Sequence, residues 1–268
     1  MTLPQLLVST APDAQARYSL LVAKDSAEVQ AAQRLRYQVF AGELGARLAG
    51  PGAAAGLDAD AFDEVCDHLV VREDATGEIV GCYRMLPPER ADEAGRLYSD
   101  GEFDLSSLAG LRPSLVETGR SCVHHEHRTG AVMSLMWAGI ARYMLLSGHR
   151  WLAGCASVPL ADGGTQARGV WDTVAAKHLS PSRYRVRPHV PWDHASVPPP
   201  NSSGSPSSSS SRSRGPLPPL LRGYLRLGAW VCGEPALDAD FGVADLFVLL
   251  SMARVDQRYL RFFLGERP

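Results

Sequence analysis

The chain has 268 residues and a mass of 28.9 kDa, and 45% of its residues are hydrophobic, which is enough for a core and excludes a globally disordered protein. The formal net charge of −2 hides a basic middle third, because residues 119–231 contain 13 Lys or Arg against 4 Asp or Glu, whereas residues 1–118 contain 10 against 19. An arginine-rich region of this kind suits phosphate groups or an acidic protein partner. No nucleic-acid-binding motif accompanies it, so we expect no nucleic-acid ligand.

The five cysteines are odd in number, widely spaced and mostly within expected buried strands, which predicts reduced core thiols in a cytoplasmic protein. The first fifteen residues contain no Lys or Arg, so they do not resemble a signal peptide. No apolar run approaches the length of a membrane span. We expect a soluble cytoplasmic protein, with transient contact with the inner face of the membrane as a further expectation.

The N-terminal part predicts an arm, a strand and a helix. Residues 1–17 read as a flexible polar arm, and Tyr18–Lys24 is the first expected strand. Asp25, followed three residues later by Glu28, resembles a capping box and predicts a helix that runs to about Leu44.

Arg36 and Phe40 lie on the flank of the apolar stripe of that helix. An arginine in this position either extends from the edge of the core into solvent or points into a site, and the residues alone leave both interpretations open. The loop at 46–61, rich in small residues, follows the helix and is expected to be mobile.

A β-hairpin is predicted next. Cys66–Glu73 and Ile79–Leu86 have the composition of strands, and the turn at 74–77 joins them. Asp67 stands at the start of the first strand and Arg84 in the middle of the second, so we expect their side chains to face one another. A structural ion pair is the alternative to a role in a site.

Residues 115–160 predict a strand, a loop, a helix and a second strand. The first strand covers about Leu115–His124, and the helix opens at Gly130, repeats apolar residues at i, i+3, i+4 and i+7, and closes at Gly148. Residues 151–160 form a short apolar run typical of a buried strand.

Two charged residues inside the first of these strands need an explanation. Glu117 and Arg120 are three residues apart and would point to opposite faces of a regular strand, but Gly119 lies between them and an interior glycine often marks a β-bulge. A bulge would bring both side chains toward one cleft and would separate this strand from its neighbour. Arg128 and the N–H groups near Gly130 then stand at a helix N-terminus, which is a ready anion site.

The C-terminal third contains one low-complexity segment. Residues 195–219 are Ser/Pro-rich and are predicted to be a disordered insertion. The expected elements around it are a helix at 165–178, an extended segment at 184–192, a helix at 220–228, short extended residues at 229–233, a strand at 246–254 and a terminal helix at 257–264.

Several blocks of the sequence, in this order, resemble the ornithine–acyl-ACP N-acyltransferases, the hemolysin-like branch of the GNAT acyltransferases that is related to the acyl-homoserine-lactone autoinducer synthases. The blocks are Leu35-Arg36-Tyr37-Gln38-Val39-Phe40, Cys66-Asp67-His68-Leu69-Val70-Val71, Gly81-Cys82-Tyr83-Arg84-Met85-Leu86, Glu117-Thr118-Gly119-Arg120-Ser121-Cys122-Val123 and the segment 220–247. Together they span most of residues 18–265.

The resemblance implies an α+β, GNAT-like fold with a mixed central sheet, a bulged strand and flanking helices. Together with the composition it divides the chain into an arm at 1–17, a core at 18–194, the Ser/Pro-rich insertion at 195–219, and the rest of the same domain at 220–268. The insertion departs from the family pattern, in which this connection is shorter. The implied enzyme is an acyltransferase that moves a long-chain, 3-hydroxylated fatty acyl group from acyl carrier protein (ACP) to the α-amine of ornithine, giving lyso-ornithine lipid. ACP and ornithine are the implied partners, and no permanently bound cofactor is expected.

Residue by residue, the resemblance implies Glu117 as the general base that deprotonates the acceptor amine. A structural pair between Glu117 and Arg120 is the alternative, and Arg120 would orient the base or bind the acceptor carboxylate. The positions that the resemblance places around the acceptor pocket are Arg36, Phe40, Asp63, Asp67 and Arg84. The loop at 46–61 corresponds to a region that covers the acceptor site in the autoinducer synthases.

On the donor side, the resemblance implies that the backbone at Ser121, Cys122 and Val123 polarises the thioester carbonyl. Arg128, Gly130 and Ala131 would bind the phosphate of phosphopantetheine. Here the chain departs from the usual GNAT phosphate loop, since one glycine stands where two are typical. A donor on ACP, with a single phosphate, fits this turn better than coenzyme A, although acyl-CoA stays an alternative.

Three further signals are weaker. His124, His125 and His127 resemble metal ligands but lack a second ligand cluster in the sequence, so no metal is expected. An acylated Cys122 or Ser121 would need a paired base that the spacing does not supply.

Glu234, before a proline, reads as a turn residue or a second acidic residue of the site.

Two rival functions stay open for the whole chain. One is a synthase of another N-acyl amino acid or of an autoinducer-type signal, and the other is a catalytically silent acyl-ACP-binding module.

Overall fold

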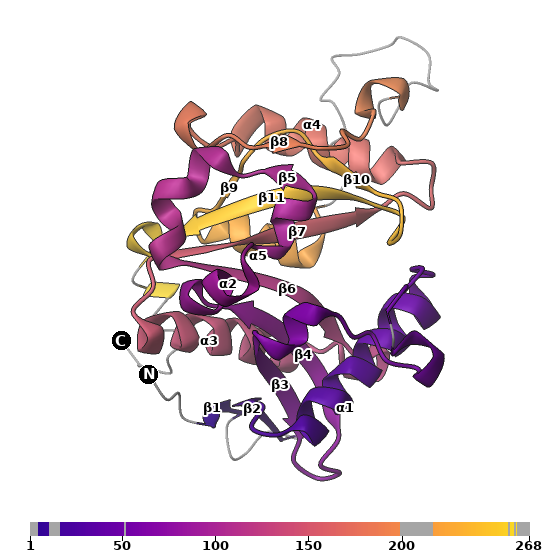
Figure 1. Ribbon diagram of the computed structural model, residues 1–268, viewed down its shortest axis with the longest axis vertical. Coiled ribbons are helices and arrows are strands. Elements are labelled where there is room, and N and C mark those ends of the chain that lie inside the picture. The colour runs from indigo at the N-terminus through magenta and orange to yellow at the C-terminus, as the bar shows by residue number, and fades with distance from the viewer. Residues whose placement is uncertain are drawn as a thin grey trace.

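The computed structural model describes residues 5–10, 17–50, 52–198, 217–256, 258, 259 and 261. Its main sheet has nine strands in the order β1-β2-β3-β4-β6-β7-β11-β10, with β9 paired to β11 (Figure 1). The pair β6–β7 is parallel and the neighbouring pairs are antiparallel. The strands are β1 (Leu6–Ser9), β2 (Tyr18–Val22), β3 (Asp67–Glu73), β4 (Ile79–Leu86), β6 (Leu115–Val123), β7 (Trp151–Pro159), β9 (Trp230–Val231), β10 (Ala236–Asp238) and β11 (Val243–Ser251).

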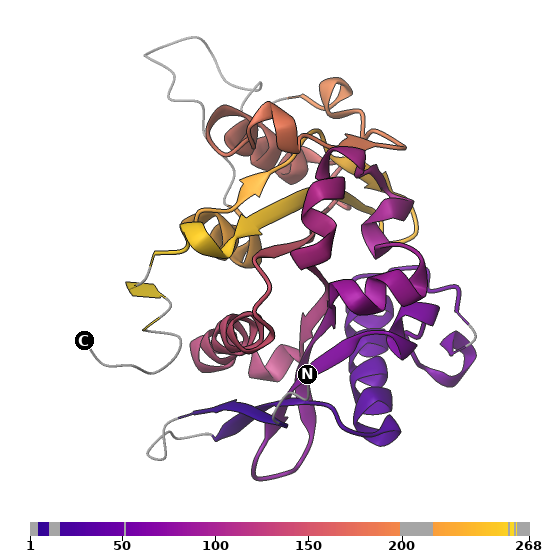
Figure 2. The same cartoon turned by 60° about the vertical axis from the view of Figure 1, so that its left-hand side comes forward.

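Helices cover both faces of this sheet. In Figure 2, α1 and α3 lie on opposite sides of the strands β3, β4 and β6. Successive side chains of a strand point to opposite faces, so each strand contributes to the core on both sides of the sheet. Leu20 of β2 belongs to the core cluster under α3, whereas its neighbour Leu21 belongs to the cluster under α1. The helices are α1 (Ser26–Tyr37), α2 (Pro88–Ala94), α3 (Gly130–Ser147), α4 (Thr165–Lys177) and α5 (Pro219–Arg226), and a small second sheet pairs β5 (Phe103–Asp104) with β8 (Arg187–Pro188).

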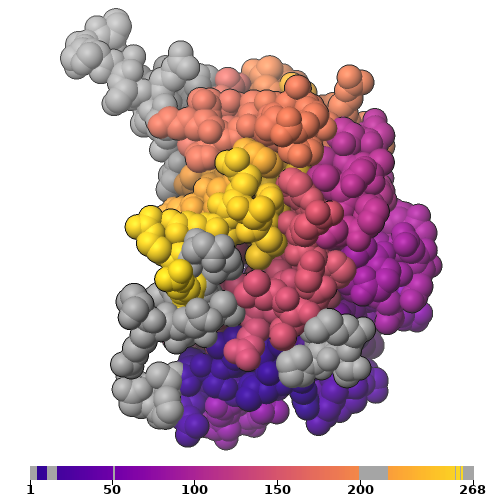
Figure 3. All heavy atoms as spheres, turned by 90° about the vertical axis from the view of Figure 1, so that its left-hand side faces the viewer, coloured from indigo at the N-terminus to yellow at the C-terminus, as the bar shows by residue number. Residues whose placement is uncertain are grey.

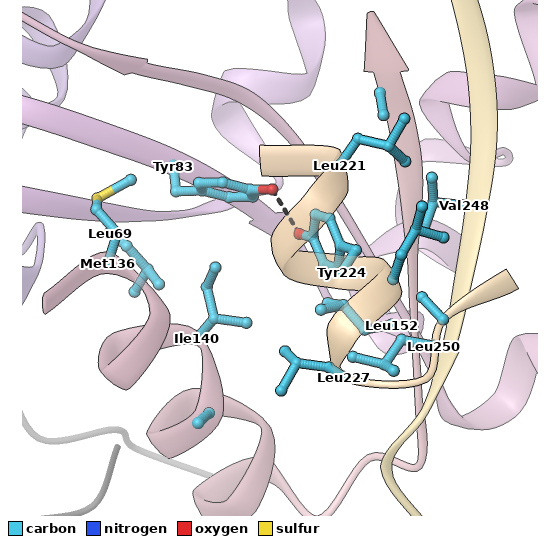
Figure 4. Close-up of a cluster of buried hydrophobic side chains, with 14 of the residues drawn as sticks. Leu69, Tyr83, Met136, Ile140, Leu152, Leu221, Tyr224, Leu227, Val248 and Leu250 are labelled. Atoms are coloured by element: carbon cyan, nitrogen blue, oxygen red, sulfur yellow. Dashed lines mark hydrogen bonds between the residues drawn. The ribbon is translucent and has the colours of Figure 1, made fainter. Parts of the chain in front are cut away.

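The largest core cluster lies under α3, α4 and α5. Leu221 of α5 and Leu227, the residue after this helix, point into it, and Ile140 of α3 approaches from the other side (Figure 4). Within this apolar region the hydroxyl groups of Tyr83 and Tyr224 are hydrogen-bonded at 2.6 Å, which satisfies two buried polar groups.

Contrary to the expectation from the sequence, one helix, α3, is long and apolar enough, by length and composition, to cross a membrane. In this structure half of it is buried, and it lies against β1, β2 and β3 as a core helix. On the face shown in Figure 3, its rose-coloured residues lie between the indigo N-terminal hairpin and the yellow C-terminal strand region.

The sheet opens between β6 and β7. Their parallel pairing ends at Glu117 and Ala153. Beyond that point β6 contains the bulge that the sequence predicts: Cys82 pairs with Cys122, whereas Arg84 pairs with Gly119, so β6 has one extra residue. The extra residue inverts the alternation of side chains, which brings Glu117 and Arg120 to the same face.

The residue with the unusual backbone in this bulge is Arg120, with φ of 51°, and not Gly119. An arginine in the left-handed region carries a conformational cost, and such residues concentrate at functional sites. The glycine that the opening requires is Gly154 of β7, because a Cβ there would lie 2.1 Å from the carbonyl oxygen of Thr118.

Most expected elements are found, with some differences. The arm contains a short strand, β1, which pairs with β2. The helix α1 ends at Tyr37 and continues as a π-helical turn, Gln38–Glu43. The last strand is Val243–Ser251, three residues earlier than expected, and the segment at 184–192 has only a two-residue strand. Residues 199–216 of the Ser/Pro-rich insertion and most of the expected terminal helix at 257–264 lie outside the described residues.

Candidate active site

A cavity of about 670 Å³ lies where β6 and β7 diverge. Glu117 and Asp245 line it from the face that carries α1 and α2. Tyr83, Thr118 and Leu220 line it from the face that carries α3 and α5. The cavity therefore extends through the opening in the sheet, so two substrates can approach it from opposite faces.

Glu117 is held rigidly at the start of the opening. The side chain is 4% exposed, and its two oxygens accept hydrogen bonds from the backbone N–H groups of Tyr98 (2.5 Å) and Ser99 (2.8 Å). Burial raises the pKa of Glu117, while these N–H groups and the Arg84 guanidinium oppose the rise. A carboxylate with a raised pKa that lines a cavity can accept a proton from a bound amine.

Three arginines and three aspartates form a cluster beside Glu117. Its ion pairs are Arg36 with Asp58 and Asp63, Arg84 with Asp60 and Asp63, and Arg120 with Asp58 and Asp60. The charges of these six residues cancel. Arg120 pairs with Asp58 and Asp60, and the structural pair between Glu117 and Arg120 that the sequence left as an alternative is not among the ion pairs of the described residues.

Asp63 is the centre of this cluster. Its carboxylate lies 2.8 Å from Arg36 Nη2 and 3.1 Å from Arg84 Nη1, and its side chain is 5% exposed. The two arginines hold the pKa of Asp63 well below its usual range in spite of burial. Arg36 itself is 1% exposed and also donates to the carbonyl oxygen of Asp58, so it anchors the loop at 46–61 from the core side.

Arg84 and Arg120 extend from this cluster into the cavity. The Arg120 guanidinium lies 4.9 Å from the ring centre of Tyr98 and 4.8 Å from that of Phe241, and its side chain is 14% exposed. Arg84 is more deeply buried, at 5%. Phe40 lines the cavity from the π-helical turn after α1.

Asp67 does not face Arg84, which corrects the expectation from the sequence. In the hairpin register Asp67 pairs with Met85 and His68 pairs with Arg84, so the two charged side chains lie on opposite faces. Asp67 accepts a hydrogen bond of 2.7 Å from the hydroxyl of Tyr143 in α3.

The residues expected on the donor side are divided between cavity and core. Ser121 lines the cavity, whereas the Cys122 thiol is buried against Cys82 at 3.5 Å, and burial raises its pKa well above the usual range. The backbone N–H of His124 donates a hydrogen bond to the carbonyl oxygen of Val80 in β4. Because the N–H groups of successive residues point to opposite edges of a strand, the N–H of Val123 points to the edge of β6 from which β7 has diverged.

The expected phosphate-binding turn stands at the N-terminus of α3. Thr129 caps the helix by accepting a hydrogen bond from Val132 N–H, and Gly130 and Ala131 are exposed beside it. Arg128 is 46% exposed and lies 2.6 Å from Glu43, a cavity-lining residue. The helix terminus and this arginine together offer N–H groups and a positive charge to an anion.

The loop at 46–61 crosses toward the turn between β10 and β11. The backbone N–H and the guanidinium of Arg47 donate to the carbonyl oxygens of Asp240 and Ala239, at 2.7 and 2.8 Å. Leu44 and Gly45, just before this loop, line the cavity. The loop is therefore tied down at the edge of the cavity.

Other residues of the cavity did not stand out in the sequence. Glu102, Cys155, Asp238 and Asp245 line it on the side of β7 and β11. The available signal was a lone aspartate, Asp245, in the apolar run of β11, which is the same signal that drew attention to Glu117. Of the three histidines, His127 is hydrogen-bonded through Nδ1 to the Tyr18 hydroxyl at 2.9 Å.

Comparison with known proteins places this chain among acyltransferases. Residues 35–138 match the family model described as an acetyltransferase (GNAT) domain. The chain is 34% identical over 264 residues to an L-ornithine N(alpha)-acyltransferase of Brucella abortus, a match that covers 91% of this chain and 88% of that protein. A protein with the same name from Rhodobacter capsulatus is 34% identical over 258 residues, with coverage of 92% and 94%.

Two solved structures have a similar fold. One is BjaI, a CoA-dependent acyl-homoserine lactone synthase determined with SAM and isopentyl-CoA, with a TM-score of 0.51, 16% identity, and coverage of 91% of this chain and 85% of that chain. The other is FeeM, an N-acyl amino acid synthase from uncultured soil microbes, with a TM-score of 0.50, 14% identity, and coverage of 89% and 92%. At these identities the likeness is one of fold.

Proposed function

The chain belongs to the L-ornithine N(alpha)-acyltransferases and has the GNAT fold, and from this membership we propose that it moves a long-chain, 3-hydroxylated acyl group from ACP to the α-amine of ornithine. The product is lyso-ornithine lipid. The resemblance, the α+β fold and the acyltransferase class predicted from the sequence are confirmed by these relatives. Donor, acyl chain and individual residue roles are our proposals.

The observation that carries the proposal is the position of Glu117. Its carboxylate lines the cavity at the point where β6 leaves β7, and two backbone N–H groups fix its orientation. Glu117 takes a proton from the α-ammonium of the acceptor, directly or through one water. The neutral nitrogen then attacks the thioester carbon, the C–S bond breaks, and phosphopantetheine leaves as its thiol.

We assign the acceptor's carboxylate to Arg120, with Arg84 behind it. Arg120 is the more exposed of the two and lies against the cavity between Tyr98 and Phe241. An arginine has five N–H donors, so pairing with Asp58 and Asp60 leaves donors for an additional carboxylate. Binding there would direct the adjacent α-nitrogen toward Glu117.

We assign the donor to the opposite side of the opening. The Val123 N–H is oriented toward the diverged edge of β6, where it can polarise the thioester carbonyl. The phosphate of phosphopantetheine would bind at Gly130 and Ala131 and draw Arg128 away from Glu43. The fatty acyl chain would lie along the apolar side of the cavity, near Tyr83 and Leu220.

We propose acyl-ACP in preference to acyl-CoA, because the phosphate turn has one glycine and the middle third of the chain is rich in arginine. Steady-state kinetics with both donors carrying the same acyl chain test this preference. We expect a higher kcat/KM for acyl-ACP, and an equal or higher value for acyl-CoA would contradict it. We also propose a cytoplasmic location and, because the product has a fatty chain, transient contact with the membrane surface.

Lipid analysis tests the function as a whole. A bacterial host that lacks ornithine lipids should, on expressing this chain, accumulate a hydroxyacyl-ornithine detectable by mass spectrometry. Expression of a Glu117→Gln variant at the same level should leave that species near background. Accumulation of an acyl-homoserine lactone or of another N-acyl amino acid would instead assign a different acceptor.

A further inference from the structure

A second acidic group lines the cavity on the side of β7 and β11, away from Glu117. Glu102 follows the short helical turn Tyr98–Gly101, Asp245 comes from β11, and Cys155 comes from β7. Their carboxylate oxygens and the Sγ atom all lie within 4.8 Å of one another. The acyl-transfer steps described above do not use these residues.

Asp245 is the member of this group that indicates a ligand. Its side chain is 3% exposed and lines the cavity, and its Oδ1 atom has no hydrogen-bond partner within the described part of the chain. Its hydrogen bonds with Ser157 and Glu102 supply no positive charge, and the Arg120 guanidinium only opposes the rise in its pKa that burial causes. A buried carboxylate without a cation in direct contact is costly, so a cation that enters the cavity here would be stabilised strongly.

The electrostatics of the pair agree with this geometry. Burial and the nearby Asp245 carboxylate raise the pKa of Glu102 to about 9, and burial raises that of Asp245. Asp238 of β10 adds a third negative charge, which raises both pKa values further. The two carboxyls therefore retain a proton when the cavity is empty, and they can both ionise when a positive charge lies between them.

The acidic pair also lies at a suitable separation from the base. Ser99 N–H donates to Glu117 at 2.8 Å, Ser99 Oγ lies 3.4 Å from Cys155 Sγ, and Cys155 Sγ lies 3.6 Å from Glu102 Oε2. A short chain of contacts through Ser99 and Cys155 thus connects the two acidic sites. In a diamino acid such as ornithine, four carbon atoms join the two nitrogens, so one nitrogen can approach each site.

Resting on the proposed function, we propose that Glu102 and Asp245 bind the side-chain ammonium of the acceptor and thereby select a diamino acid and protect its distal nitrogen from acylation. The α-ammonium then stays with Glu117, and the distal nitrogen is held as a cation, without the lone pair that attack requires. A divalent metal is the competing occupant. It is disfavoured because burial raises the pKa of the Cys155 thiol well above its usual range, whereas a metal requires the thiolate.

The test compares two acceptors that differ only at the distal nitrogen. Norvaline has the carbon chain of ornithine with a methyl group in place of the aminomethyl group. Wild-type enzyme, given saturating acyl donor, should prefer ornithine over norvaline by at least about 100-fold in kcat/KM. In Glu102→Gln and Asp245→Asn the value for ornithine should fall about 100-fold while that for norvaline stays the same or rises.

Glu93→Gln, an exposed carboxylate of α2, is the matched control and should keep the wild-type preference. Thermal melting checks folding, and Glu102→Gln remains informative if Asp245→Asn does not fold. Equal losses for both acceptors in a folded variant would overturn the proposal, because only the distal nitrogen distinguishes them. Loss of wild-type activity in EDTA with recovery on adding Zn²⁺ would overturn it in favour of a metal.

The result also separates this inference from the proposed function. If the wild-type enzyme acylates norvaline as rapidly as ornithine, N-acyltransfer to amino acids stands and the role of the acidic pair is lost. If neither amino acid is acylated with either donor and another acceptor is, the proposed function fails first.

Discussion

Replacing Glu117 with glutamine separates its role as a base from its role in the fold. Glutamine keeps the shape and one acceptor oxygen, but its amide NH₂ group meets the backbone N–H of Tyr98 or Ser99, where the carboxylate accepted bonds of 2.5 and 2.8 Å. One hydrogen bond is lost and one buried N–H is left unpaired, at a cost of about 1–3 kcal/mol. Because glutamine is neutral, the variant no longer buries a charge, which offsets part of this cost.

The expected catalytic loss is larger than this effect on folding. Removing a general base lowers kcat by about 10²–10⁴-fold, equivalent to about 3–5 kcal/mol of barrier. A protein with about 5–15 kcal/mol of stability stays folded after losing about 2 kcal/mol, so unfolding cannot explain the lost rate. Raising the pH should partly restore turnover of the variant, since it supplies neutral amine without a base.

The assay is single-turnover acylation of ornithine from pH 6 to 10, beside urea denaturation of the same preparations. Glu78→Gln, an exposed glutamate in the β3–β4 turn, is the matched control and should keep wild-type rates. Turnover of Glu117→Gln within about fivefold of wild type would refute the assignment of the base.

Three further outcomes are expected. Asp63→Asn removes the shared partner of Arg36 and Arg84 and should cost about 3 kcal/mol of unfolding free energy at pH 7. Because the pKa of Asp63 is depressed in the folded protein, its contribution to stability is complete above about pH 4 and is lost in acid, so the stabilities of wild type and variant in urea titrations should converge at acidic pH. Gly154→Ala places a Cβ 2.1 Å from a backbone carbonyl of β6 and should cost about 1–3 kcal/mol or more, and an unchanged urea midpoint would contradict this. Binding of acyl-ACP, measured by anisotropy, should weaken as salt rises, since charges are screened beyond about 10 Å at 0.1 M, and a Kd independent of salt would show that the basic region does not contact ACP.

The elements of the fold were predictable because their signals are local. Asp25 caps α1, with its side chain accepting from two N–H groups, and Gly148 ends α3 in the left-handed conformation. The expected bulge is present, yet its unusual backbone falls on Arg120, since a glycine in a strand does not fix which neighbour takes up the extra residue.

The site was less predictable because its contacts join distant segments. The side chains of Asp67 and Arg84 lie on opposite faces of the hairpin, because the register of β3 and β4 decides which side chains share a face. A shift of one residue in that register would move every side chain of one strand to the other face. Glu102 and Asp245 meet only after β11 is placed beside β7 by the sheet order. A charged residue within an apolar strand drew attention to Glu117, whereas the same signal at Asp245 was missed, and the sequence alone did not identify the partners of either.

Acylation of the α-amine is tested most directly by the position of the new amide bond. The purified chain is incubated with hydroxyacyl-ACP and ornithine labelled with ¹⁵N at the α position only, and the product is examined by proton–nitrogen correlation NMR. If the α-amine is the acceptor, the product gives a single amide N–H that carries the label. An amide on the unlabelled distal nitrogen, with the α-nitrogen still a free amine, would contradict it.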